Sequence, residues 1–223
     1  MLKMALSGGL AAVTLLTAAV SATAATENLI VNGTFDTNTT GWTGVYTTRD
    51  GDPTIDTGPY FFPGPGAFHM IFQDYALTSP QLDSLATTGL SFTLSADLFG
   101  WRYQEDRGTL SVFFNDADNE RIDSATLLSS TSYDGYWDSD IEAGGKYFQS
   151  LSGLVPFETA SLSFVITSTR IGGGTNNDGY IDNASFTMAP VAPVPLPAAL
   201  PLMGAGIIAL RLVGRRRGND VTA

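Results

Sequence analysis

The chain has 223 residues, and its 22 acidic residues outnumber its 11 basic ones, which gives a formal net charge of −11. The stretch 26–190 holds six basic residues against 21 acidic ones and therefore carries −15. A body with this charge does not suit nucleic-acid binding, because that binding depends on lysine and arginine neutralising phosphates. The absence of cysteine excludes disulfides, thiol catalysis and cysteine-ligated metals, and any Ser-His-Asp triad would depend on the single histidine, His69.

Residues 1–25 have the three parts of a secretory signal peptide. Lys3 supplies a positive charge, an apolar stretch covers 5–20, and small residues at 21–25 suit cleavage after Ala24 or Ala25. A permanent N-terminal anchor is the alternative, and the small residues and the polar residues after them disfavour it. We therefore expect the protein to be exported.

The C-terminal part combines a Pro-rich linker at 190–198, an apolar stretch at 199–213 and a basic tail at 214–223. The apolar stretch predicts a short hydrophobic helix that barely spans a hydrocarbon core of about 30 Å. By the positive-inside rule the basic cluster stays cytoplasmic, which places the body across the membrane. A plain C-terminal anchor is the alternative. The predicted membrane stop consists of Arg215, Arg216 and Arg217.

A specific motif precedes this helix, formed by Val194, Pro195, Leu196, Pro197 and Ala198. The order of motif, hydrophobic helix and arginine cluster resembles the PEP-CTERM class of sorting signals in its VPLPA-CTERM variant. The resemblance implies a Gram-negative bacterium, an exosortase-type processing protease as partner and a transient inner-membrane anchor. After cleavage the body would reach the cell surface or the extracellular matrix. The replaced Pro-Glu-Pro motif leaves open which exosortase relative acts.

The body, residues 26–189, contains short runs of alternating apolar and polar residues between clusters of turn-forming residues. The segment Ser79–Thr88 is predicted as a loop with one helical turn. Strands without intervening helices favour an all-β fold, a single antiparallel jelly-roll β-sandwich of about nine strands. The predicted strands are Asn28–Val31, Gly44–Thr48, Ala67–Gln73, Leu90–Leu98, Leu110–Phe114, Arg121–Leu128, Lys146–Leu151, Leu162–Thr167 and Gly179–Met188.

The two ends of the body carry a second resemblance. The stretch Asn28–Asp36, followed by Gly41 and Trp42, resembles the opening of galactose-binding-like jelly rolls, a fold that many carbohydrate-binding modules share. The stretch Gly179–Phe186 is similar to their closing strand. The resemblance implies that the two ends lie close together and that a structural Ca²⁺ is held near them. Asp36 and Asp182 are the candidate ligands, and surface or turn acids are the alternative.

Aromatic residues in polar surroundings are the candidate ligand-binding residues, because aromatic rings stack on the apolar faces of sugars while nearby polar groups bind the hydroxyls. Core packing is the alternative for each of them, and we expect Phe35 and Trp42 to lie in the core. The candidates are Trp101, Tyr103, Tyr133, Tyr136 and Trp137.

Three other patterns favour ordinary structural roles. The stretch Asp116–Glu120 starts like an EF-hand loop but lacks its glycine and its final glutamate, so a β-hairpin turn is expected. Asn176–Gly179 is also expected to be a turn, and His69 a half-buried strand residue. No catalytic residues are predicted, because paired carboxylates arise by chance among so many acids.

These features predict an exported, surface-sorted, non-catalytic β-sandwich protein that binds carbohydrate or exopolysaccharide. Two alternatives remain. One is a structural protein of the matrix or surface without a small ligand, and the other is a polysaccharide-active enzyme.

Overall fold

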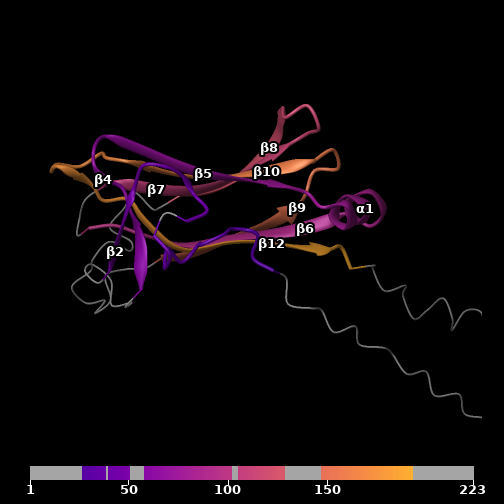
Figure 1. Cartoon of the computed structure of the whole chain (residues 1–223), viewed down its shortest axis with the longest axis horizontal. Coiled ribbons are helices and arrows are strands. Elements are labelled where there is room, and N and C mark those ends of the chain that lie inside the picture. The colour runs from indigo at the N-terminus through magenta and orange to yellow at the C-terminus, as the bar shows by residue number, and fades with distance from the viewer. Residues whose placement is uncertain (1–26, 39, 51–57, 102–104, 129–146, 193–223) are drawn as a thin grey trace, which may run out of the picture.

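The computed structural model describes residues 27–38, 40–50, 58–101, 105–128 and 147–192 (Figure 1). The predicted signal peptide, sorting motif, hydrophobic helix and arginine cluster lie outside these ranges. Within them, no helix combines the length and the apolar character that a membrane span requires.

Two five-stranded antiparallel sheets pack face to face, which confirms the predicted β-sandwich (Figure 1). The first sheet has the order β1–β5–β10–β7–β8, with bounds Thr43–Gly44, Phe68–Ala76, Ser161–Thr169, Arg107–Asn115 and Arg121–Leu128. The second has the order β2–β3–β12–β6–β9, with bounds Thr47–Asp50, Pro59–Phe62, Tyr180–Pro190, Leu90–Phe99 and Tyr147–Leu154. A small ladder joins β4 (Gly64–Pro65) to β11 (Asn176–Asn177), and helix α1 (Ser79–Thr87) lies at one end of the sandwich.

The alternating strand residues meet between the sheets and form the main core. Burial of this apolar surface is the main favourable contribution to folding, at about 25 cal/mol per Å². Phe35 and Trp42 belong to it, as predicted, and their rings stack with centroids 6.0 Å apart. The strands contribute alternate buried residues, among them Leu94, Leu110, Ile166 and Phe186.

The segment Asn28–Val31 does not form the predicted strand, but it lies beside the last strand, β12, as expected. This segment is irregular: the Leu29 amide donates to the Phe186 carbonyl at 2.8 Å, and polar side chains add further hydrogen bonds. The Asn28 side-chain oxygen accepts from the Phe186 amide at 2.9 Å, and its Nδ2 donates to the Ala184 carbonyl at 3.1 Å. The Gln73 amide exchanges two further hydrogen bonds with the backbone of Val31. The two ends of the body therefore lie side by side, as expected.

The turn after this segment explains the remaining residues of the opening motif. Asn32 adopts a positive φ of 52°, and its side chain bonds to the backbone of Thr37, Asn38 and Thr40. Gly33 packs directly on the last strand, because a Cβ at this position would lie 1.9 Å from the Ala184 carbonyl oxygen. These residues fold the turn, so this part of the motif has a structural role.

The predicted strand Gly44–Thr48 is wrong, because the chain changes sheets within it. Gly44 ends β1 in the first sheet, and Thr47 begins β2 in the second. Gly44 permits this step with a φ of 132°, a backbone conformation that side chains disfavour. Strand β3 has no counterpart among the predicted strands, since its aromatic residues are buried on both faces and show no alternation.

The segment Ser79–Thr88, predicted as a loop with one turn, forms the nine-residue helix α1 instead. Its start is stabilised by Gln81, whose side-chain oxygen accepts from the Thr78 amide at 2.8 Å. Proline near the first helical position also favours a helix start. The helix buries only Leu85, so no long apolar stripe marks it in the sequence.

Candidate functional site

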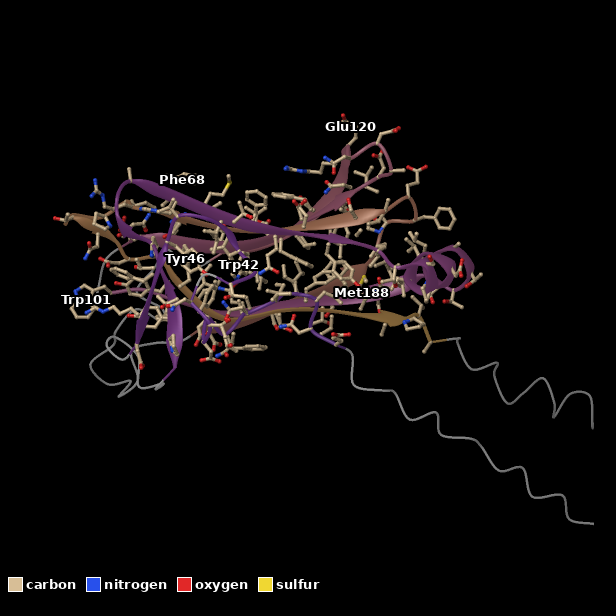
Figure 2. All side chains as sticks on the ribbon, in the orientation of Figure 1. Trp42, Tyr46, Phe68, Trp101, Glu120 and Met188 are labelled. Carbon is tan, nitrogen blue, oxygen red and sulfur yellow. The ribbon has the colours of Figure 1, made fainter. Side chains whose placement is uncertain are left out.

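The outer face of the first sheet points away from the core and is open along β5, β10, β7 and β8. Figure 2 shows Phe68 on the outer side of this layer, whereas Trp42 and Tyr46 lie between the sheets. The strand registers place the outward residues in rows across the sheet. We call the following set the open face: Phe68, Met70, Phe72, Asp74, Thr109, Ser111, Phe113, Ser124, Thr126, Ser163, Val165 and Thr167.

An apolar stripe runs along β5 on the open face. Phe68 is 57% exposed and Met70 is 50% exposed, and Phe72 continues the stripe as a half-buried residue. At about 3.3 Å per residue, the stripe from Phe68 to Phe72 extends about 13 Å. The inward residues between them are Ile71, which is buried in the core, and His69, half-buried as predicted. The open face thus offers a strip of apolar surface long enough to contact an extended chain molecule.

Pairs of hydroxyl groups lie beside this stripe. Thr109 and Thr167 are directly opposite each other on β7 and β10, and their Oγ1 atoms are 2.6 Å apart. Ser111 and Thr126 form the equivalent pair on β7 and β8, with oxygens 2.8 Å apart. A hydroxyl can donate one hydrogen bond and accept two, so the half-buried Thr109–Thr167 pair and the exposed Thr126 keep capacity for a ligand, whereas Ser111 is buried.

A polar cluster closes one end of the open face. The Ser163 hydroxyl donates to Asp74 Oδ1 at 2.7 Å and accepts from Asn115 Nδ2 at 3.1 Å. The guanidinium of Arg121 lies 3.5 Å from the centroid of the Phe113 ring, a cation–π contact. The exposed carboxylate of Asp74 therefore continues the line of the apolar stripe on β5, and the exposed guanidinium of Arg121 lies across the sheet from it on β8.

The predicted ligand-binding aromatics lie elsewhere. Trp101 is half-buried and packs against a second aromatic cluster on the outer face of the second sheet, where Tyr60, Phe99 and Tyr180 are fully buried. Trp101 thus contacts this cluster, and its role in ligand binding stays a prediction. The other four candidates, Tyr103, Tyr133, Tyr136 and Trp137, lie outside the described residues.

Tyr180 is the centre of this second cluster. Its ring lies 5.2 Å from that of Tyr60 and 5.5 Å from those of Phe99 and Phe62, and its hydroxyl donates to Asp178. Burial and the Asp178 hydrogen bond raise the pKa of Tyr180 well above its usual range. On this part of the outer face of the second sheet, around β3 and the adjoining ends of β6 and β12, the aromatic residues pack against one another.

The two predicted calcium ligands have different surroundings. Asp36 is exposed in the turn and accepts a hydrogen bond from Thr34 at 2.7 Å. Asp182 is 3% exposed, lies opposite Asp97 in the ladder, and accepts from the Asn183 amide at 2.7 Å. No group of three or more acidic or histidine side chains that could hold a metal occurs in the described ranges. The side chains present there do not by themselves form a calcium cage.

Asp106 is an organising residue that sequence reasoning did not identify. Its fully buried carboxylate accepts backbone hydrogen bonds from Ile171, Gly172 and Asp178 at 2.6–2.8 Å. It thereby fixes the loop between β10 and β12. The predicted turn Asn176–Gly179 is wrong in part, because Asn176–Asn177 form strand β11, and Asn177 and Asp178 are buried in this arrangement. A run of turn-forming residues in a sequence does not show whether the loop that it forms is buried or exposed.

The open face also escaped the sequence analysis, although one signal was present. In β5, Phe68, Met70 and Phe72 are interleaved with inward-facing residues, so apolar side chains occupy both faces of the strand. A strand of this kind either lies between two layers or exposes an apolar stripe. The Asp116–Glu120 stretch is the predicted hairpin turn, with Asp116 Oδ1 accepting from two amides of the turn.

Comparisons with known proteins reveal a shared fold. No protein-family model and no curated protein sequence matches this chain. Among solved structures, a similar one is the enzymatically active domain of tailspike protein 4 from bacteriophage CBA120, with a TM-score of 0.52 and 15% identity. The match covers 73% of this chain and 21% of the tailspike chain, and an arabinofuranosidase is matched over 26% of its length.

Smaller similar structures include a CBM4 protein, at 16% identity over 72% of this chain and 99% of the other, with a TM-score of 0.38. The xylan-binding CBM22-1 domain of Paenibacillus barcinonensis Xyn10C is 12% identical over 71% of this chain and 93% of its own, with a TM-score of 0.41. The likeness is one of fold.

Proposed function

We propose that this chain is an exported, surface-sorted and non-catalytic protein whose β-sandwich binds carbohydrate through the open face. The ligand class is a neutral, extended polysaccharide such as an exopolysaccharide of the cell surface or extracellular matrix. The observation that carries the proposal is the exposed apolar stripe on β5, with the Asp74 carboxylate on the same strand, hydroxyl groups on the neighbouring strands and the Arg121 guanidinium across the sheet on β8. Binding sites combine apolar area with a few convergent polar groups in this way.

The charge of the protein supports a neutral ligand. The body carries −15, so an anionic polysaccharide would be repelled unless cations intervened. The open face itself is nearly neutral, because its polar groups are mostly hydroxyls. Asp74 and Arg121 supply opposite charges at the same end of the sheet.

The small number of carboxylates on the open face supports a binding role over a catalytic one. Glycoside hydrolysis uses a pair of carboxyl groups about 5–10 Å apart on either side of the scissile bond. On the outward positions of the described strands of the open face, Asp74 is the one carboxylate. Release of reducing ends from any bound polysaccharide would instead favour the enzyme alternative.

Affinity electrophoresis tests the binding proposal. The probes are xylan, hydroxyethyl cellulose and mixed-linkage β-glucan as neutral polymers, with polygalacturonate as the acidic one. We expect a neutral polymer to retard the protein, and Phe68→Ala with Phe72→Ala to weaken that binding about tenfold or more. Phe148→Ala is the matched control, because Phe148 is an equally exposed aromatic that lies on the second sheet, away from the open face.

Two results would contradict the proposal. Retardation that is insensitive to the Phe68 and Phe72 changes but lost in Trp137→Ala would move the site to the aromatic stretch predicted from the sequence. Failure of every polymer to retard a folded protein would favour the structural protein without a small ligand.

The export and sorting part of the proposal rests on the sequence motifs at the two ends. We expect surface or culture material to lack the signal peptide and the arginine cluster at Arg215–Arg217. Intact-mass measurement checks both ends at once. Retention of the arginine cluster in surface material would contradict processing at the VPLPA motif.

Calcium binding by Asp36 and Asp182 remains a prediction. If a structural Ca²⁺ is bound, it will raise the melting temperature by mass action, since it binds the folded state alone. Asp182→Ala should abolish that increase. An identical melting temperature in calcium and in chelator would contradict the prediction.

A further inference from the structure

Among the described residues, no strand pairs with the outer side of β9, and this free edge differs from the other three edges of the two large sheets. The edge strands are β1 and β8 in the first sheet and β2 and β9 in the second. Strand β1 has only two residues, β8 carries Arg121 and Asp123, and β2 carries Arg49 and Asp50. Short or charged edges are the usual protection against pairing with another chain. Strand β9 lacks both forms of protection. It has eight residues, Tyr147–Leu154, and none of them is charged.

The side chains of β9 are also unusually apolar for an exposed edge. Phe148 is 67% exposed and Leu154 is 68% exposed, and Leu151 between them is 40% exposed. Phe157, which follows the strand, is 71% exposed. In a body that carries −15, this neutral strand is a place where two copies can approach without direct charge repulsion.

The backbone of β9 fixes which residues can pair across the free edge. The Val155 amide donates to the Leu90 carbonyl, and β9 pairs antiparallel with β6. Backbone groups alternate in direction along such a strand, so the odd-numbered residues, including Leu151, point theirs toward β6. The residues whose amides and carbonyls face the free edge are Phe148, Ser150, Ser152 and Leu154.

The order of these four residues is self-complementary. A two-fold axis at Leu151 places Phe148 of one copy opposite Leu154 of the other, and Ser150 opposite Ser152. Each of these pairs is then a hydrogen-bonded pair of the antiparallel ladder, and the two Leu151 residues form the close, non-hydrogen-bonded pair at the axis. Two-fold interfaces require such self-complementarity, and apolar cross-strand pairs add stability.

We propose that β9 is a homodimerisation edge, at which two copies of this chain pair antiparallel about a two-fold axis at Leu151 and join their second sheets into one ten-stranded sheet. We assign a second copy as the partner for three reasons. The residues that would pair are alike in the two copies, their free amides and carbonyls face each other, and neither strand carries a charge. One strand forms the whole contact, so the interface belongs to the small, reversible class. The proposal is independent of the carbohydrate site, which lies on the other sheet.

A cysteine at the axis provides a direct test in the full-length chain, which has no other cysteine. In a non-hydrogen-bonded antiparallel pair the two Cα atoms lie about 4.5 Å apart, within the range that a disulfide bridges. Leu151→Cys should therefore form a disulfide-linked dimer under mild oxidation. Ser124→Cys, at an exposed position of the charged edge β8, is the control and should remain largely monomeric.

Charge pairing provides the second test and uses surface positions that leave the core intact. In sedimentation velocity, Ser150→Lys with Ser152→Lys should abolish the concentration-dependent dimer, because lysines would face lysines across the axis. Ser150→Glu with Ser152→Glu should also abolish the dimer, because glutamates would face glutamates. Mixing the lysine variant with the glutamate variant should restore a dimer, because opposite charges would then face each other. Ser124→Lys with Thr126→Lys places two charges at the same spacing on β8 and should leave the dimer unchanged.

Three outcomes would overturn the proposal. The unaltered chain could be monomeric throughout the concentration series. A dimer could persist in both β9 charge variants, or it could be lost equally in the β8 control.

Discussion

The outer faces of the two sheets treat aromatic residues in opposite ways. On the first sheet, Phe68 and Phe72 lie on an open face beside hydroxyl groups. On the second sheet, Tyr60, Phe99 and Tyr180 are fully buried in a cluster that Trp101 and Phe62 flank. The two groups of aromatic residues differ in exposure: Phe68 on the first sheet is 57% exposed, whereas the cluster around Tyr180 on the second sheet is buried.

This difference shows why aromatic content alone does not locate a binding face. Aromatic residues contribute large apolar areas in either setting. The open face is distinguished by polar groups on the strands next to its rings, which bind one another and stay partly exposed, as the Thr109–Thr167 pair does. In the buried cluster, by contrast, the polar partner of Tyr180 is the buried Asp178.

Removing one aromatic ring from each face should separate the two roles most clearly. Tyr180→Ala should reduce the free energy of unfolding by about 3–5 kcal/mol, because it leaves a large cavity in a fully buried cluster. Phe68→Ala should change it by no more than about 0.5 kcal/mol, as is usual for exposed positions. Urea denaturation measures both. A comparable loss in the two variants would mean that the faces do not differ as described.

The second prediction concerns the loop that supports the buried cluster. Asp106→Asn should lower the free energy of unfolding by about 2–4 kcal/mol, because it removes the charge that binds the amides of Ile171, Gly172 and Asp178. Asp123→Asn on the exposed β8 edge is the matched control and should change it by about 0.5 kcal/mol or less. Equal effects of the two changes would show that the Asp106 contacts do not stabilise the loop.

The sequence predicts the long strands well because one of their faces is buried and the other is not. Leu90–Leu98 and Leu162–Thr167 alternate in the sequence, and they form β6 and β10 with the same faces buried. Strand β3 and helix α1 were missed for the opposite reasons. Strand β3 buries both faces and shows no alternation, whereas α1 buries one residue and depends on its N-terminal capping.

The candidate site was harder to predict, because it depends on which strands are neighbours. Asp74, Ser163 and Phe113 lie on three different strands and form one row only through the registers of β5, β10 and β7. No spacing in the sequence brings them together. The opening motif around Asn32 is conspicuous in the sequence, but the structure assigns it to a turn.

Alkaline pH should affect the buried tyrosines. Burial raises the pKa of Tyr46 from 10.0 to about 12. A raised pKa in the folded state means that the stabilisation is fully present below pH 10 and is lost as the pH rises from 10 to about 12. Thermal unfolding between pH 8 and 12 should therefore show a falling midpoint, with a smaller fall in Tyr46→Phe. An equally steep fall in this variant would contradict the assignment.

The smallest expected effects lie at the polar end of the open face. Asp74→Asn keeps an oxygen that can accept from Ser163 but removes the charge, and Arg121→Lys loses the planar guanidinium over Phe113. Each should weaken polysaccharide binding about three- to tenfold, since charge-assisted hydrogen bonds are stronger than neutral ones.

Neither change should alter the melting temperature appreciably, because both side chains are exposed. Calorimetric titration with the polymer that gives the strongest retardation measures the two affinities, and Asp83→Asn on the exposed helix α1 is the control. If affinity were unchanged in both variants while Phe68→Ala abolished binding, the ligand would contact the apolar stripe alone. The polar cluster would then serve only to order β5, β10 and β7 against one another.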